Sequence, residues 1–151
     1  MAQTGETVLR LRDGMAFEAS TGSGHTIILD AARDRGGDDR GPRPIELLLV
    51  GLGACTGMDV ISILRKMRQP VTGYELKVRG ERSADHPMIF TDILVEHVVY
   101  GRGVTPESVR RAVELSETRY CPVGAMLGKA ATVTHQYRVV EDAAADASSA
   151  G

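Results

Sequence analysis

Two cysteines, Cys55 and Cys121, carry the most reactive side chains of this 151-residue sequence. Two cysteines in a chain of this length cannot form a disulfide scaffold, so thiol chemistry stays open. Cys121 precedes a proline that can open a helix, and the positive end of a helix favours a thiolate. Cys55 lies inside a predicted helix, where Asp59, one turn further on, would oppose its ionisation if the carboxylate points toward the sulfur. Both cysteines could instead be small buried hydrophobic residues.

Ionisation of Cys55 would need a nearby cation, and the sequence offers Arg10, Arg12 and Arg65 on pattern alone. Arg12 is the most suggestive of the three because Asp13-Gly14 follows it, and a tight turn there gives the end of a hairpin a definite direction. Each of the three arginines could equally be a solvated surface charge.

The histidines give little support for metal or hydrolytic chemistry. None of the four is paired at a helical metal-ligand spacing, so no metal site is predicted: they are His25, His86, His97 and His135. A cysteine hydrolase or acyl-transfer enzyme that pairs a thiol with a histidine stays open, because such partners meet only in the folded chain, but no nucleophile-elbow motif is present. The glycine turns lack the pattern of a phosphate-binding loop, and no cofactor is expected.

The N-terminal third predicts strands followed by a loop. Residues 8–12 and 15–19 flank Asp13-Gly14 and predict a β-hairpin, and residues 25–30 predict a third strand. Residues 32–43 are charged, glycine-rich and without period, which indicates a surface loop.

A long helix follows, which Pro44 can open and which should run to about residue 67. Residues 47–58 are apolar on all sides, which predicts burial of the helix rather than one face against solvent. The helix contains three glycines, each costing about 1 kcal/mol relative to alanine and calling for close packing: Gly51, Gly53 and Gly57.

The remainder predicts two strands, a helix, a short helix and a last strand: 74–82, 90–100, 105–115, 121–127 and 131–140. The order is βββ-α-ββ-α-α-β, an α+β fold with antiparallel strands around a long buried central helix. We expect one domain over residues 1–141 and a disordered tail over residues 142–151.

Composition argues against several partners. Eighteen basic and twenty acidic residues leave a formal net charge of −2, which provides no electrostatic surface for nucleic acid or an anionic membrane. The longest apolar run, residues 47–52, is too short to span a bilayer, and the N-terminus lacks a signal-peptide pattern. We therefore expect a cytoplasmic protein.

Residues 43–64, RPIELLLVGLGACTGMDVISIL, together with residues 119–123, RYCPV, resemble the osmotically inducible protein C family, which includes the organic hydroperoxide resistance proteins. The resemblance implies an interleaved homodimer with an active site at the dimer interface. It also implies that Cys55 attacks an organic hydroperoxide, that Cys121 closes a disulfide and that an external dithiol, of lipoyl type in the family, restores both thiols. Arg12 matches the position of the family arginine that supports the thiolate.

One departure from the family pattern concerns the acid that orients this arginine. The family peroxidases have a glutamate directly after the helix-opening proline, whereas this chain has Ile45 there and Glu46 one residue later. One residue turns a helical side chain by about 100°, so Glu46 is a provisional orienting acid, and the chain resembles a less characterised branch.

We therefore predict a thiol-dependent peroxidase acting on organic hydroperoxides. The alternative is a non-catalytic dimeric protein with structural cysteines that binds a small apolar molecule at its interface.

Overall fold

The computed structural model describes residues 4–141, which form two compact units, one ending at Leu48 and one beginning at Leu49. The element order is the predicted βββ-α-ββ-α-α-β, so the α+β class is confirmed. The single domain over residues 1–141 stays a prediction, and the tail expected at residues 142–151 lies outside the described residues.

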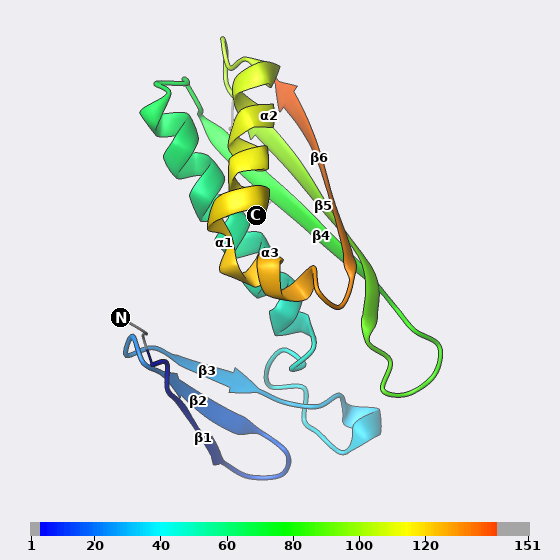
Figure 1. Cartoon of the computed structure of the whole chain (residues 1–151). Helices are drawn as coiled ribbons and strands as arrows, with labels where there is room; N and C mark the ends of the chain where they lie inside the picture. Colours follow the sequence, from blue (N-terminus) through cyan, green and yellow to red (C-terminus); the bar gives the residue numbers. More distant parts are fainter. Residues whose placement is uncertain (1–3, 142–151) are drawn as a thin grey trace. The chain divides into compact units, whose positions relative to one another are not determined.

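The N-terminal unit holds an antiparallel sheet in the order β1-β2-β3 (Figure 1). Its elements are β1 (Thr7–Leu11), β2 (Phe17–Thr21), β3 (Thr26–Leu29) and the short 3-10 helix η1 (Arg33–Arg35). The predicted hairpin is confirmed, and Gly14 has the positive φ of 62° that the turn requires. Leu11 pairs with Phe17, so residues 12–16 connect the strands instead of a two-residue turn.

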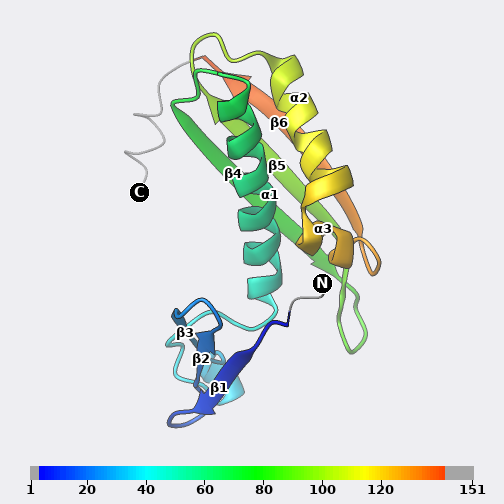
Figure 2. The ribbon, with the colours of Figure 1, turned by 60° about the vertical axis from the view of Figure 1, so that its left-hand side comes forward.

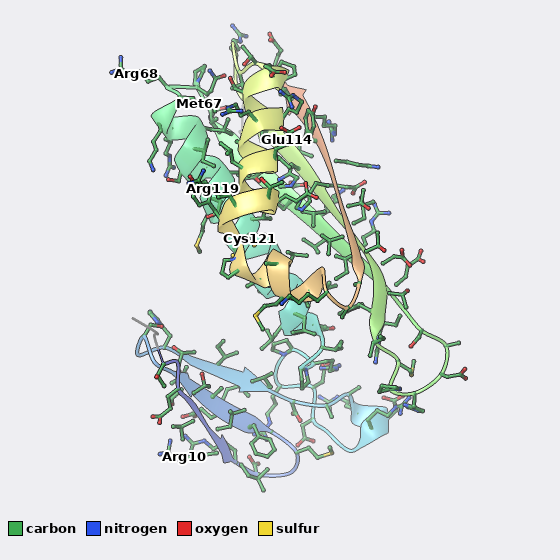
Figure 3. All side chains as sticks on the ribbon, in the orientation of Figure 1. Arg10, Met67, Arg68, Glu114, Arg119 and Cys121 are labelled. Carbon is green, nitrogen blue, oxygen red and sulfur yellow. The ribbon has the colours of Figure 1, made fainter. Side chains whose placement is uncertain are left out.

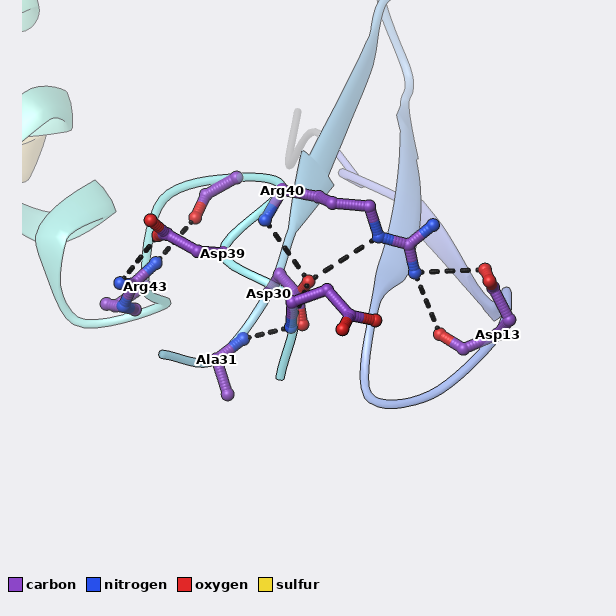
Figure 4. Close-up of polar contacts among 8 residues, drawn as sticks. Asp13, Asp30, Ala31, Asp39, Arg40 and Arg43 are labelled. Atoms are coloured by element: carbon purple, nitrogen blue, oxygen red, sulfur yellow. Dashed lines mark hydrogen bonds and ion pairs between the residues drawn. The ribbon is translucent and has the colours of Figure 1, made fainter. Parts of the chain in front are cut away.

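The predicted surface loop after β3 is organised around one buried carboxylate, that of Asp30 (Figure 4). Its oxygens accept hydrogen bonds from the backbone N–H groups of Ala31, Asp38 and Arg40, at 2.8 to 3.2 Å. The Arg40 guanidinium also reaches Asp13 in the hairpin turn, 2.9 Å away. Because a buried carboxylate needs such donors, this cluster defines the path of the loop.

In the C-terminal unit, three helices cover one face of a three-stranded sheet, as Figure 2 shows from a second side. Its elements are α1 (Glu46–Lys66, whose first turn lies in the N-terminal unit), β4 (Gly73–Arg82), β5 (Phe90–Tyr100), α2 (Pro106–Leu115), the π-helical turn η2 (Ser116–Tyr120), α3 (Pro122–Leu127) and β6 (Thr132–Val140).

The last strand corrects the expectation of antiparallel strands throughout. β4 and β5 are antiparallel, but β6 is parallel to β5, with Val95 opposite His135 and Val99 opposite Val139. Parallel neighbours need a crossover connection, and the helical segment from α2 to α3 provides it. The sequence predicted these helices. It did not predict that they return the chain to the end of the sheet at which β5 begins.

Two glycines of α1 are closely packed, as the free-energy cost of glycine inside a helix predicts. A Cβ on Gly53 would lie 3.0 Å from the Val78 side chain, and one on Gly57 would lie 3.1 Å from Leu76. Both neighbours belong to β4, so the absence of a side chain lets α1 approach the sheet closely.

The opposite face of α1 is exposed in the single chain, contrary to the expectation of burial on all sides. Leu52 and Val60 are fully buried, whereas Val50 and Met58 are 59% and 70% exposed. By length and composition alone α1 could cross a membrane, yet its inward face packs into the core of the C-terminal unit. The exposed apolar stripe is therefore a surface that a second chain could cover.

Candidate active site

The two cysteines meet in the folded chain, and an acid lies beside them. The Sγ atoms of Cys55 and Cys121 and a carboxylate oxygen of Asp59 lie within 4.8 Å of one another. Cys55 and Asp59 are four residues apart on α1 and share a face, as the helical spacing predicts. Cys121 comes from the point where η2 ends and α3 begins (Figure 3). Helix packing thus joins residues that are 66 positions apart in the sequence.

Cys121 is the N-cap of α3, and Pro122 occupies the first helical position, as the sequence predicts. Its sulfur accepts a hydrogen bond from the backbone N–H of Gly124 at 3.2 Å, which by itself lowers the pKa of the thiol. Burial and the nearby Cys55 outweigh this bond and raise the pKa to about 11. The helix end that the sequence predicts is present, but desolvation outweighs the stabilisation that it gives to a thiolate.

Asp59 is held in place by a buried hydroxyl pair. The Ser116 hydroxyl donates to Oδ2 of Asp59 at 2.8 Å, and it is 2.9 Å from the Thr56 hydroxyl. Thr56 lies on α1, Ser116 begins the π-helical turn η2, and both side chains are buried. Neither hydroxyl could be recognised as a site residue from the sequence, because only the packing of η2 against α1 brings them together.

The two other predicted site residues lie in the N-terminal unit, where they have separate partners. The Arg12 guanidinium donates to Glu18 through both Nε and Nη2, at 3.1 and 2.6 Å. Glu46 accepts a hydrogen bond from the backbone N–H of Arg43 at 3.0 Å, which caps the start of the helix. The contacts within this unit therefore give Arg12 an acid partner other than Glu46.

A pocket of about 440 Å³ lies on the α3 side of Cys121. Apolar side chains such as Leu52 and Val133 line it together with three titratable groups, Glu117, Lys129 and His135. The pocket thus combines apolar walls with a few polar groups, which is typical of sites that bind small molecules.

His135 is the outer member of a hydrogen-bonded chain that runs into the core. The Tyr74 hydroxyl is 2.6 Å from Nδ1 of His97, and Nε2 of His97 is 3.0 Å from Nδ1 of His135. Burial raises the pKa of Tyr74, so its hydroxyl stays protonated and donates to His97. Neutral His97 must then carry its proton on Nε2 and donate it to His135, which leaves the proton of His135 on its own Nε2.

The histidine chemistry of a cysteine hydrolase has no support in this geometry. Among residues 4–141, the hydrogen bonds of His97 and His135 run to each other and to Tyr74, and the sulfur of Cys121 accepts from Gly124. A nucleophile activated by histidine needs a direct hydrogen bond between the two.

Comparison with known proteins gives a consistent picture. The family model described as OsmC-like protein matches residues 36–136. Protein YhfA of Escherichia coli (strain K12) is 41% identical over 128 residues, which covers 85% of this chain and 92% of that protein. A crystal structure of a protein from Aquifex aeolicus VF5 is similar with 32% identity and a TM-score of 0.78, over 93% of this chain and 100% of that one. The organic hydroperoxide resistance protein OhrB of Bacillus subtilis shares the fold, with 18% identity and a TM-score of 0.60 over 90% and 98% of the two chains.

Proposed function

Because this chain belongs to the OsmC-like protein family, we propose that it is a thiol-dependent peroxidase that reduces organic hydroperoxides with Cys55 and Cys121. The observation that carries the proposal is the approach of the two sulfur atoms to within 4.8 Å. A family fold with a nearby cysteine pair fits a peroxidase-like role, because the second thiol can capture the oxidised first one before further oxidation.

Cys55 is the attacking residue because its side chain is half-buried and can be reached, whereas Cys121 is buried. The Cys55 thiolate forms a bond to the terminal oxygen of the hydroperoxide, the O–O bond breaks, and the alkoxide leaves as an alcohol after taking a proton. Cys55 is then a sulfenic acid. The sulfur of Cys121 attacks it, hydroxide leaves as water, and a disulfide remains.

The second step needs a base, because burial raises the pKa of Cys121 to about 11. The Asp59 carboxylate lies within 4.8 Å of both sulfurs and can take the thiol proton as the disulfide forms. The same proton can then protonate the departing hydroxide. The Asp59 carboxylate is thus the proposed base of the second step.

Arg12 is the proposed cation for the Cys55 thiolate, as its match to the family arginine implies. Its Nε and Nη2 groups both donate to Oε2 of Glu18, which favours Glu18 over Glu46 as the acid that orients it. Arg65, another cation suggested by the sequence, lies ten residues beyond Cys55 on α1, a separation of about 15 Å along the helix.

The proposal includes a reductant and a location. The disulfide must receive two electrons to return to the thiols, and an external dithiol, of lipoyl type, supplies them. The thiols carry these electrons themselves, so the cycle needs no bound cofactor. A reducing cytoplasm suits a protein whose resting state has free thiols.

We also propose that the exposed stripe of α1 forms the interface of a homodimer. Met58 is 70% exposed on this stripe, so Met58→Glu places a charge against an apolar surface and should shift a dimer to monomers in analytical ultracentrifugation. Arg111→Glu, on the exposed side of α2, is the control and should leave the dimer intact. A wild-type protein that sediments as a monomer at micromolar concentration contradicts this interface.

Intact-mass measurement with thiol titration tests the proposed function. One equivalent of cumene hydroperoxide should remove both thiols of the reduced protein and lower its mass by two hydrogens, and dihydrolipoamide should restore them. Hydrogen peroxide should react more slowly, because apolar side chains such as Leu52 and Val133 in the pocket beside Cys121 favour an apolar peroxide. Survival of both thiols would overturn the proposal and leave the dimeric binding protein, for which the pocket beside Cys121 is then the place to seek a ligand.

A further inference from the structure

We propose that the reduced Cys55–Asp59–Cys121 cluster binds one Zn²⁺ ion per chain. The sequence offered no metal site because the histidines and cysteines lack a metal-ligand spacing along the chain. The fold instead brings two sulfurs and a carboxylate oxygen within 4.8 Å of one another. Binding to this cluster does not depend on the proposed peroxidase activity.

The donor set suits zinc more than the hard cations. Thiolate sulfur is a soft ligand, which Zn²⁺ accepts at about 2.3 Å, and a carboxylate oxygen is a common third ligand at about 2.0–2.2 Å. Magnesium and calcium take oxygen ligands only, so one carboxylate between two sulfurs would hold them poorly. Because Cys55 is only half-buried, the fourth tetrahedral position can be filled by water.

Hydrogen bonds from neighbouring residues orient two of the three proposed ligands. The Ser116 hydroxyl donates to Oδ2 of Asp59 at 2.8 Å, which holds the carboxylate beside the two sulfurs. The Gly124 N–H donates to the Cys121 sulfur at 3.2 Å and supports its negative charge as a thiolate. Such outer contacts are typical of protein metal sites, where they fix ligand direction before the ion arrives.

Two of the ligands come from one helix, and the third is the N-cap of another. Cys55 and Asp59 are four residues apart on α1, and Cys121 is fixed as the N-cap of α3 by its bond to Gly124. Two ligands one turn apart on a helix, joined by a third from a neighbouring segment, can close around one ion without rearrangement of a loop.

Zinc binding and disulfide formation exclude each other. When zinc binds, each sulfur forms a bond to the ion and releases its proton to solvent, so binding should strengthen as pH rises. When the pair is oxidised, the two sulfurs bond to each other and no thiolate remains for the ion. The cluster would therefore hold zinc in its reduced form and release it on oxidation.

Competition with a chromophoric zinc chelator tests the proposal on the reduced full-length protein. One equivalent of Zn²⁺ per chain should be withdrawn from the chelator, and Mg²⁺ at the same concentration should not compete. Diamide, which takes two electrons and two protons from the thiols and is itself reduced to the hydrazine, should return the zinc to the chelator. Diamide replaces a hydroperoxide here so that failure of peroxidase activity does not affect the result.

Single substitutions identify the ligands. Cys55→Ser, Cys121→Ser and Asp59→Asn should each weaken zinc binding at least about tenfold, and Ser116→Ala should weaken it by about tenfold through Asp59. Glu114→Gln, an exposed acid on α2, should bind as the wild type does. Asp59→Asn is nearly isosteric, and its circular dichroism spectrum checks that the fold is kept. No stoichiometric binding, or equal binding by wild type and Asp59→Asn, overturns the proposal.

Discussion

Cys55→Ser is expected to abolish hydroperoxide reduction, with kcat/KM lower by at least about 10³-fold, because a serine hydroxyl is not ionised at neutral pH and does not attack the O–O bond. The change removes one sulfur atom from a half-buried position, so the fold should survive. A coupled assay that follows dihydrolipoamide oxidation with cumene hydroperoxide measures this loss. Ser62→Ala, an exposed change on the same helix, is the control and should keep wild-type rates.

Cys121→Ser should fail at a different step. Cys55 can still attack, so one equivalent of hydroperoxide is consumed, but no second thiol captures the product. The sulfenic acid should therefore persist long enough to be labelled by dimedone, and excess peroxide should convert it to the sulfinic acid. Equal activity of Cys55→Ser and wild type would overturn the assignment of Cys55 as nucleophile. A disulfide between the Cys55 residues of two Cys121→Ser chains, formed in place of the dimedone adduct, would contradict the expected persistence of the sulfenic acid.

The second large effect is a loss of stability in acid that comes from His97. Burial, with a smaller contribution from the charge of His135, lowers the pKa of His97 to about 4, against about 6.5 in an unfolded chain. Between these values the unfolded chain binds a proton that the folded chain does not, so stability falls as pH falls. The contribution of neutral His97 to the free energy of unfolding is complete above about pH 7. It is lost as the pH falls from about 6.5 to 4, which lowers the free energy of unfolding by about 3 kcal/mol.

Urea unfolding at pH 7.5, 6.0 and 5.0 measures this effect. The free energy of unfolding of the wild type should decrease steadily over the series, and that of His97→Gln should decrease less, because glutamine does not titrate. His97→Gln should be less stable than the wild type at pH 7.5, since Tyr74 and His135 lose their hydrogen-bond partner, so the comparison concerns the slope with pH. Equal slopes for the two proteins would mean that His97 does not govern acid stability.

The order of the secondary structure was accessible from the sequence because its signals are local. A turn glycine at Gly14, a first-turn proline at Pro122 and the period of apolar residues act over a few residues, and the structure contains each element where they predict it. The close packing around Gly53 and Gly57 was also predictable from their free-energy cost within a helix, whereas the identity of the neighbour, β4, was not.

Features that depend on distant segments were predicted wrongly or not at all. The parallel pairing of β6 with β5 follows from the path of the chain through α2 and α3, which no local period encodes. The helix end that favours a thiolate at Cys121 is visible in the sequence, whereas the burial that raises the pKa of its thiol arises from packing. The exposed side of α1 was predicted to be buried because an apolar sequence does not reveal whether its cover comes from the same chain.

The sequence contains the reactive groups of this protein: two thiols, one of them with an acid one helical turn away, and a pattern specific enough to indicate its family. The folded chain brings the thiols together, places Asp59 beside both and holds it with the buried hydroxyl of Ser116. Residue types and helical spacing can be recognised in the sequence because they are local properties. Distance, desolvation and hydrogen bonding between Cys55 and Cys121 arise when α3 packs against α1, across 66 residues of chain.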